Sequence, residues 1–386
     1  MTTLICIIYL GFVALGLPDS LFGSAWPILQ TNFDVPLSYA GFVTMTISGG
    51  TILASLFSDR LTYRFGASKV TAFSIAATAV ALFGFSRATA FWHLVVWAVP
   101  LGLGAGAVDA ALNNFVALHF SSRHMSWLHC FWGLGASISP YIMGFWLSKD
   151  LRWDRGYLSV SLILAALAAL LFASLPLWNR VQAQPGEITR TAPKTIRQIV
   201  ALPGIFYVLF AFFAYCAIEG IAFIWTSSYL VRARALPEVT AARFASLFYL
   251  GMTLSRFLTG FFADRLGDRR MICLGYYVTF AGLLLVLLPF SSPMPALVGM
   301  VLAGFGCGPI YPAIIHATPD VFGKENSQAV VGVQMAAAYC GTTFMPPLFG
   351  LLANHVDIRL FPICLLVFAV LGFLLIQLLY RRKAAV

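Results

Sequence analysis

Charged residues are scarce in this chain. Asp, Glu, Lys and Arg make up 10% of its 386 residues, whereas 60% of the residues are hydrophobic. The mean hydropathy of +0.87 excludes a soluble domain, because water could not solvate such a surface. The composition therefore predicts a polytopic membrane protein.

Cysteine and histidine are also few, at seven and six residues. The cysteines are scattered through apolar stretches without metal-ligand spacing, and we interpret them as small lipid- or core-facing residues. There is no glycine-rich phosphate loop, metal-ligand cluster or nucleophile motif, so we expect neither an enzyme nor a cofactor or metal site. The net charge of +10 would favour nucleic acid in a soluble protein. Here the basic residues lie mostly in short loops between apolar runs, where they set membrane orientation, and we expect no nucleic-acid partner.

Apolar runs long enough to cross a bilayer recur along the chain, since a spanning helix needs roughly 20 such residues. They predict an all-α protein of twelve transmembrane helices in two six-helix halves. The first run has no basic leader segment, and we interpret it as a retained span. The predicted spans are 4–29, 37–57, 69–86, 91–118, 125–147, 157–178, 200–230, 242–262, 271–290, 295–317, 327–353 and 358–380.

A single long polar stretch, 179–199, divides the chain near its middle. We interpret it as a cytoplasmic linker between an N-terminal half, 1–178, and a C-terminal half, 200–386. With both termini inside, about 15 of the 24 Lys and Arg residues fall in cytoplasmic segments and about 8 in outer loops. This bias predicts a multi-pass protein of the inner (cytoplasmic) membrane with both termini in the cytoplasm.

The two halves repeat one glycine pattern about 200 positions apart. Residues 102–106, GLGAG, return as 304–308, GFGCG. Gly135, Pro140 and Gly144 return with the same spacing as Gly341, Pro346 and Gly350. The repetition indicates a duplicated membrane unit, and folds built from paired repeats usually move a solute through the seam between them.

The loop after the eighth predicted span reads GFFADRLGDRR, and a looser copy follows the second span. Both resemble the G-x3-D-R-x-G-x-R-R loop of the major facilitator superfamily, whose contacts latch one conformation. The glycines permit a tight turn and the carboxylates can pair with a basic group or a helix end. The resemblance implies that the gating residues are Asp59, Arg60 and Gly66 in the first copy, and Gly260, Asp264, Arg265, Gly267, Arg269 and Arg270 in the second.

Three acids, Asp19, Asp109 and Glu219, lie near the middles of spans one, four and seven. Placing a charge there costs roughly 2.5–3.5 kcal/mol on insertion scales, so such residues usually face a cavity, pair or carry protons. Gly102, Gly106, Asp109 and Asn113 share one helical face, on which we expect the glycines to leave space. Asp19 follows Pro18 and has an alternative role, relieving a broken helix. Arg256 is a buried base that could pair with Glu219 or Asp19, or bind an anionic substrate.

Residues 102–116, GLGAGAVDAALNNFV, resemble the fourth span of the fucose:proton symporter family. The family pattern there is G-L-G-x-G-x-x-acid-x3-N, which implies that Asp109 carries the coupling proton. Residues 128–140 resemble the family's fifth span, and Glu219, Trp225 and Tyr229 resemble its seventh. The chain departs from the family at His129, where the best-known members carry an amide, and at Asn114, which replaces a proline.

Amides, hydroxyls and flat aromatic faces suit a sugar, and several such side chains fall at mid-membrane depth. The predicted substrate-binding residues are Asn113, Asn114, His129, Trp132, Trp225, Tyr229, Tyr311 and Gln334. His129 and Trp132 share a helical face, and His129 could also relay protons. The expected helix breaks are Pro309, Pro312, Pro346 and Pro347.

Together these observations predict a transporter of the major facilitator fold, with two halves rocking around a central cavity, and the family resemblance implies that it works as a monomer. Its expected activity is proton-coupled symport of a small polar solute, a sugar or sugar derivative, with Na⁺ as an alternative coupling ion. The main alternative is a proton-antiporting exporter of drugs or metabolites, because the loop motif does not distinguish import from export. A receptor built on the same fold is a further alternative, although the chain offers no long soluble signalling domain.

Overall fold

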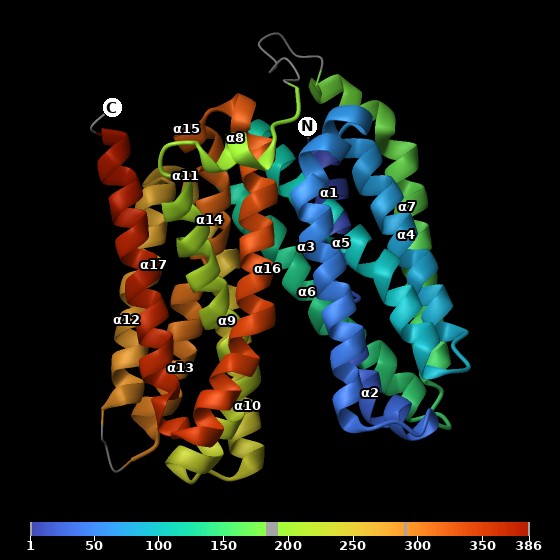
Figure 1. The fold of residues 1–386 in the computed structure, drawn as a ribbon, viewed down its shortest axis with the longest axis vertical. Helices are drawn as coiled ribbons and strands as arrows, with labels where there is room; N and C mark the ends of the chain where they lie inside the picture. Colours follow the sequence, from blue (N-terminus) through green and yellow to red (C-terminus); the bar gives the residue numbers. More distant parts are fainter. Residues whose placement is uncertain (1, 183–191, 289–291, 385–386) are drawn as a thin grey trace. The chain divides into compact units, whose positions relative to one another are not determined.

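The computed structural model describes residues 2–182, 192–288 and 292–384, and in these ranges the chain is helical with no strand (Figure 1). The α-helices are α1 (Thr2–Gly16), α2 (Leu21–Asn32), α3 (Ala40–Phe65), α4 (Ala67–Ser86), α5 (Phe91–His119), α6 (Ser122–Leu147), α7 (Trp153–Gln182), α8 (Ile196–Val200), α9 (Ile205–Arg234), α10 (Glu238–Thr259), α11 (Ala263–Leu266), α12 (Asp268–Leu287), α13 (Met294–Cys307), α14 (Ile310–His316), α15 (Thr318–Phe322), α16 (Lys324–His355) and α17 (Phe361–Ala384). Two 3₁₀ turns precede α3 and α17, at Leu37–Tyr39 and Ile358–Leu360.

Each of the twelve predicted spans corresponds to one helix or to a helix pair, which confirms the predicted fold class. Within the described ranges, ten segments are both long and apolar enough to cross a membrane. The other two, α6 and α10, are 26 and 22 residues long but less apolar. Polar residues such as His129 and Arg256 lower the hydropathy of these two helices, and both of these side chains are buried.

Two of the spans are broken helices. The first span divides into α1 and α2 at residues 17–20, around Pro18, and the tenth divides into α13 and α14 at Gly308 and Pro309. The break expected at Pro309 is therefore present, whereas Pro346 and Pro347 lie inside the continuous helix α16. Pro312 lies inside α14, so breaks at these three positions were wrongly predicted.

The described chain forms two compact units. The first contains residues 1–119, 127–194 and 324–335, and the second contains 120–126, 195–323 and 336–386. Two helices are therefore shared, because α6 and α16 each begin in one unit and continue in the other. The division of the chain at 179–199 stays a prediction, and residues 183–191 of that segment lie outside the described residues.

The same close helix contacts recur in both units. In the first unit, a Cβ atom on Gly102 of α5 would overlap the carbonyl oxygen of Ile47 on α3. In the second, a Cβ on Gly304 of α13 would overlap the carbonyl oxygen of Phe248 on α10. Both glycines thus admit a neighbouring backbone that any side chain would exclude. The repeated sequence pattern is matched by a repeated packing pattern.

A second pair of glycines shows the same correspondence. Gly135 of α6 lies against the carbonyl oxygen of Val13 on α1, and Gly341 of α16 lies against that of Phe213 on α9. The sequence prediction that glycines on α5 leave an open space was wrong for Gly102 and Gly106, because the backbone of α3 fills the space beside both.

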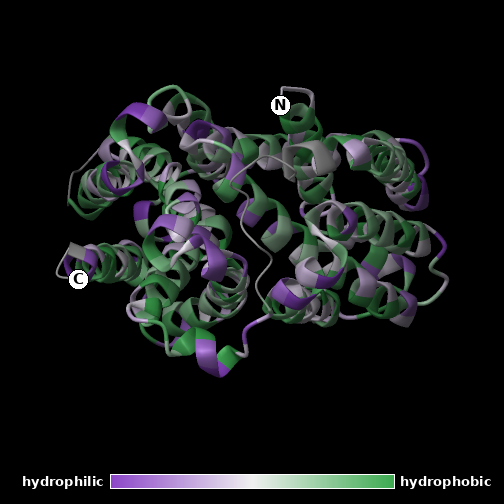
Figure 2. Cartoon of the chain, turned by 90° about the horizontal axis from the view of Figure 1, so that it is seen from above, coloured by the Kyte–Doolittle hydropathy of each residue, from purple (hydrophilic) through white to green (hydrophobic). Residues whose placement is uncertain are grey.

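Large apolar side chains are exposed along the helices of both units. They include Phe73 and Leu162 in the first unit and Phe210 and Val367 in the second. Figure 2 shows that apolar residues predominate along the helices. Exposure of this kind suits contact with lipid chains and agrees with the spans assigned from length and composition.

Candidate functional site

A chain of buried polar side chains joins α5 to α6 in the first unit. The Asn113 amide nitrogen donates to Asp109 Oδ1 over 2.7 Å, and Asn113 Oδ1 lies 3.0 Å from His129 Nε2. Asp109, Asn113 and His129 are 4%, 0% and 5% exposed. Because Asn113 Oδ1 can only accept, His129 Nε2 must carry a hydrogen and donate it. The structure therefore brings three of the predicted site residues into one hydrogen-bonded network.

The spacing of residues along the two helices creates this network. Asp109 and Asn113 are four apart on α5, so they lie on one helical face, and Asn113 also bonds the Asp109 carbonyl oxygen at 3.0 Å. His129 enters from α6, where its ring packs edge-on against Phe12 of α1. The imidazole is thereby held by an apolar ring and a polar amide.

Asp19 lies in the break between α1 and α2 and is an exposed residue. Trp132 Nε1 donates to Asp19 Oδ2 over 2.8 Å, so α6 supplies both His129 and Trp132 to this part of the unit. The carboxyl groups of Asp19 and Asp109 also interact electrostatically. Asp19 Oδ2 accepts this hydrogen bond from an indole and not from a backbone amide. The bond therefore gives no support to the alternative role of Asp19, relieving the broken helix.

Asn114 faces a different helix from its neighbour Asn113. Its amide nitrogen donates to Gln328 Oε1 over 2.9 Å, and its carbonyl oxygen accepts from the Ser327 hydroxyl. Both partners lie at the start of α16, in the segment that belongs to the first unit. The predicted substrate-binding amide of Asn114 is thus bonded to protein groups in this structure.

A second buried charged cluster lies in the second unit. Arg256 Nη2 lies 3.7 Å from Glu219 Oε1 and 3.5 Å from the Tyr215 hydroxyl, which itself donates to the Cys307 carbonyl oxygen. The Arg256 side chain is 3% exposed and that of Glu219 is 13% exposed. Of the two counter-ions that the sequence offered for Arg256, the structure places Glu219 beside it.

The other predicted binding residues pack into helix contacts. Trp225 Nε1 donates to the Pro346 carbonyl oxygen over 2.9 Å, and the Tyr229 ring stacks on Phe361 at 4.9 Å. The ring of Tyr311 contacts two aromatic side chains of α9, Phe212 and Tyr215. Gln334 of α16 is fully buried within the first unit. Their substrate contacts stay a prediction.

The two loop motifs have equivalent turns but different surroundings. Gly66 and Gly267 each precede a helix with positive φ. Asp59 and Arg60 lie on the last turns of α3 and not in a loop, because α3 continues to Phe65. Asp59 Oδ2 accepts a hydrogen bond from the Lys194 backbone at 3.0 Å.

In the second copy, Gly260 ends α10 and Asp264 lies on the short helix α11. Asp264 accepts hydrogen bonds from the Ser121 hydroxyl and from both the backbone and the side chain of Arg123. Burial tends to raise the pKa of Asp264, but the hydrogen bonds and charge of Arg123 outweigh it and hold that pKa below its usual value. Arg265, Arg269 and Arg270 are exposed.

Sequence reasoning missed the contacts around Asp268. This carboxylate accepts from the Ser122 hydroxyl over 2.6 Å and contacts His316 Nδ1 at 2.7 Å, while His316 Nε2 contacts the Phe120 carbonyl oxygen at 3.1 Å. Asp268 belongs to the loop motif. However, no pattern in a single sequence links it to Ser122 and His316, which are 146 and 48 positions away. The cluster fastens the segment 120–126 within the second unit.

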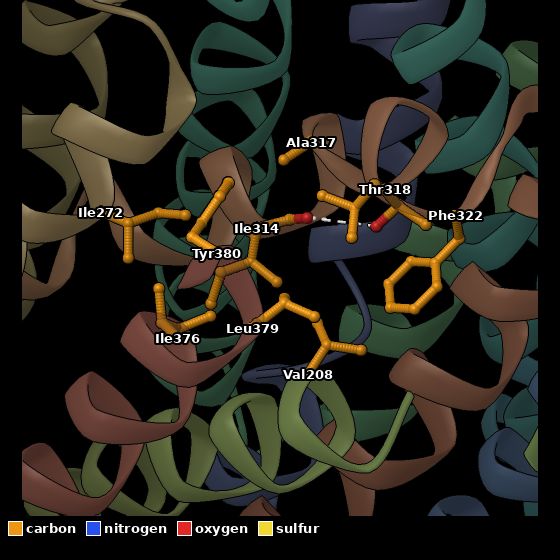
Figure 3. A pocket seen from close by; sticks show the side chains of 10 residues that line it. Val208, Ile272, Ile314, Ala317, Thr318, Phe322, Ile376, Leu379 and Tyr380 are labelled. Atoms are coloured by element: carbon orange, nitrogen blue, oxygen red, sulfur yellow. Dashed lines mark hydrogen bonds between the residues drawn. The ribbon is translucent and has the colours of Figure 1, made fainter. Parts of the chain in front are cut away.

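A small apolar cavity near the end of α14 does not resemble a polar solute site (Figure 3). The Thr318 hydroxyl in its wall donates to the Ile314 carbonyl oxygen over 3.1 Å. The other lining side chains are apolar except for Tyr380, and none is a predicted site residue. In the parts of the chain that the structure covers, no group of three or more His, Cys, Asp or Glu residues could hold a metal ion.

The chain thus has two paired repeats of six spans, in which the first and tenth spans are broken helices. Buried acids lie within the spans. The profile of the Major Facilitator Superfamily matches residues 8–245 and 239–386, nearly the whole chain. The chain belongs to the major facilitator superfamily. This confirms the resemblance predicted from the loop motif and shows a membrane transporter fold whose members are not enzymes.

Characterised relatives transport different solutes. The cis,cis-muconate transport protein of Acinetobacter baylyi is 24% identical over 86% of this chain and 83% of its own length. The glucose/mannose transporter of Bacillus subtilis is 24% identical over 91% of this chain and 88% of its own. The solved structure of the Escherichia coli fucose:proton symporter superposes with a TM-score of 0.74 at 13% identity, covering 96% of this chain and 98% of the symporter. That likeness shows the fold alone.

Proposed function

We propose that this superfamily transporter carries out proton-coupled symport of a small polar solute, a sugar or sugar derivative, by alternating access. The observation that carries the proposal is the buried network of Asp109, Asn113 and His129. An acid inside a membrane span is costly, and such residues usually belong to ion or proton pathways. The glucose/mannose transport relative supports a sugar as the solute.

In this proposal Asp109 binds the proton that accompanies the solute inward. Asn113 presents its amide hydrogen to Asp109 and its oxygen to His129, so a change of protonation at either end alters the hydrogen bonding of the other. Asp19 and Glu219 are further proton-binding candidates. Coupling arises because the two conformations differ in proton affinity, so that proton and solute favour the same state. Na⁺ is an alternative coupling ion in the same scheme.

An organic anion is a second candidate solute. Arg256 is almost fully buried, and its guanidinium lies 3.7 Å from Glu219, beyond ordinary hydrogen-bonding distance. A carboxylate solute could replace Glu219 as the partner of this cation. The muconate transport relative supports testing a dicarboxylate beside sugars.

The test uses purified protein in liposomes that contain a pH-sensitive dye. Fucose, glucose, mannose and cis,cis-muconate are added outside in turn, and internal acidification is recorded for the wild type, for Asp109→Asn and for the control Asp154→Asn. We expect sugar-driven acidification in the wild type and the control that is lost in Asp109→Asn. Solute-driven alkalinisation would instead support the antiporting exporter.

We further propose that the transporter lies in the inner membrane of the cell, acts as a monomer and has both termini in the cytoplasm. The distribution of Lys and Arg between alternate loops supports the orientation of the termini. Labelling of single cysteines introduced near each terminus, in intact and in permeabilised cells, tests this orientation.

A further inference from the structure

A groove opens at the start of α12, on the outer surface of the second unit. It is lined by Leu266 at the end of α11 and by five residues of α12: Arg269, Arg270, Cys273, Leu274 and Tyr277. The two arginines stand at the first turn, and the apolar part continues for two further turns. From Arg269 to Tyr277 the helix rises about 12 Å.

Helix α17 packs against α12 and forms the neighbouring wall. Three contacts follow the pair along its length. Arg269 lies over the Tyr380 ring at 5.2 Å, Gln377 Nε2 lies 3.1 Å from Cys273 Sγ, and Tyr277 packs against Phe373 at 5.5 Å. The cation–π contact positions the Arg269 guanidinium at the groove without neutralising its charge.

Positive charge gathers at this end of the helix pair. Arg381 and Arg382 occupy the last turn of α17 and are exposed, as are Arg269 and Arg270. Among the described residues, no carboxylate oxygen lies within 4.0 Å of these four guanidinium groups. The nearby Asp268 carboxylate is bonded to Ser122 and His316.

The same surface is apolar beyond the arginines. Leu274 and Tyr277 are 46% and 55% exposed, and Leu374 and Leu378 of α17 are 52% and 45% exposed. Both helices are long and apolar enough to span the membrane, so this face meets lipid. Cationic groups above such a face lie where phospholipid headgroups lie.

We propose that the groove at the start of α12 binds an anionic phospholipid, with its headgroup phosphate on Arg269 and Arg270 and an acyl chain along Leu274 and Tyr277. Paired guanidinium groups suit a phosphate because they donate several hydrogen bonds in fixed geometry. The adjoining apolar wall favours a lipid over free phosphate, because free phosphate has no acyl chain to pack against Leu274 and Tyr277.

The test measures lipid binding to the purified full-length protein by native mass spectrometry, with dioleoyl-phosphatidylglycerol or dioleoyl-phosphatidylcholine in the detergent micelle. We expect preferential retention of phosphatidylglycerol that falls about 30-fold in Arg269→Gln/Arg270→Gln, as the loss of ~1 kcal/mol per arginine implies. Arg87→Gln/Arg359→Gln removes the same charge at exposed sites outside the groove and should leave binding unchanged. The variant Arg269→Lys/Arg270→Lys keeps both charges and should retain most of the phosphatidylglycerol binding. It therefore reports whether the loss in the glutamine variant is due to charge.

Three results would overturn the proposal. Equal retention of phosphatidylglycerol by the wild type and by the glutamine variant would show that the groove does not bind it. Equal retention of phosphatidylcholine would remove the role of headgroup charge. Displacement of the lipid by inorganic phosphate at matched concentration would assign the arginines to a free anion.

Discussion

Gly66 and Gly267 have nearly the same backbone conformation, with φ and ψ of 80° and 152° in the first and 76° and 156° in the second. Each ends one helical segment and caps the start of the next. This region of φ and ψ is essentially limited to glycine. The two loop motifs therefore share their turn even though the rest of the first copy has diverged.

We predict that Gly267→Ala destabilises the protein by about 1–3 kcal/mol. A Cβ at Gly267 would meet nothing within 4 Å, so the cost is conformational and not steric. Thermal unfolding in detergent checks this. The matched control is Gly49→Ala, also with open space but inside α3, where alanine should be neutral or slightly stabilising. Equal effects of the two substitutions would contradict the prediction.

Asn113 and Asn114 are adjacent, yet they should respond differently to alanine. Asn113→Ala removes the amide between Asp109 and His129, and we expect solute-driven proton movement to be lost together with about 1–3 kcal/mol of stability. Asn114→Ala removes the bonds to Ser327 and Gln328 but leaves the Asp109 network intact. Hydrogen exchange should then rise at the start of α16 in Asn114→Ala alone. The same exchange pattern in both variants would refute this separation.

Glu219 and Arg256 should show strong energetic coupling. Replacing either one removes the opposite charge beside a buried charge, so Glu219→Gln and Arg256→Gln should each destabilise by about 3–5 kcal/mol. The double variant should be more stable than the sum of the single losses predicts. A double-mutant cycle on unfolding midpoints measures the coupling, and additive losses would show that the 3.7 Å pair does not interact.

The Arg123–Asp264 pair predicts a pH dependence. The pKa of Asp264 is lower in the folded protein than in the unfolded chain, so its contribution to stability is present above the unfolded pKa of about 3.9 and is lost as pH falls through the folded value. Because both side chains are partly exposed, the contribution should be about 1 kcal/mol or less. Asp264→Asn should remove it at neutral pH and flatten the stability profile below about pH 4. An unchanged profile would contradict the assignment.

The sequence predicted elements better than contacts. Spans such as 69–86 and 91–118 follow from apolar length alone, and the paired glycines correctly indicated a repeated unit, because close helix packing leaves a local signal. Spacing and a family resemblance also singled out Asp109, Asn113 and His129, which the structure joins by hydrogen bonds, whereas their roles in transport stay a prediction.

Other features had no local signal. The bonds from Asn114 to Ser327 and Gln328 join residues 213 and 214 positions apart, and the bond from Arg123 to Asp264 spans 141. No periodicity within one sequence encodes such partners. Helix α3 continued past Asp59 to Phe65 because the residues between them carry no helix breaker before Gly66.

Because α6 and α16 are shared, each half of the sequence contributes a short segment to the unit that is formed mainly by the other half. Residues 120–126 lie in the first half of the sequence but belong to the second unit, and residues 324–335 lie in the second half but belong to the first. A chain cut between the halves would produce two fragments, each holding a piece that the other needs to be complete. Such fragments, synthesised together, should recognise each other as domain-swapped subunits do, and neither should fold fully alone.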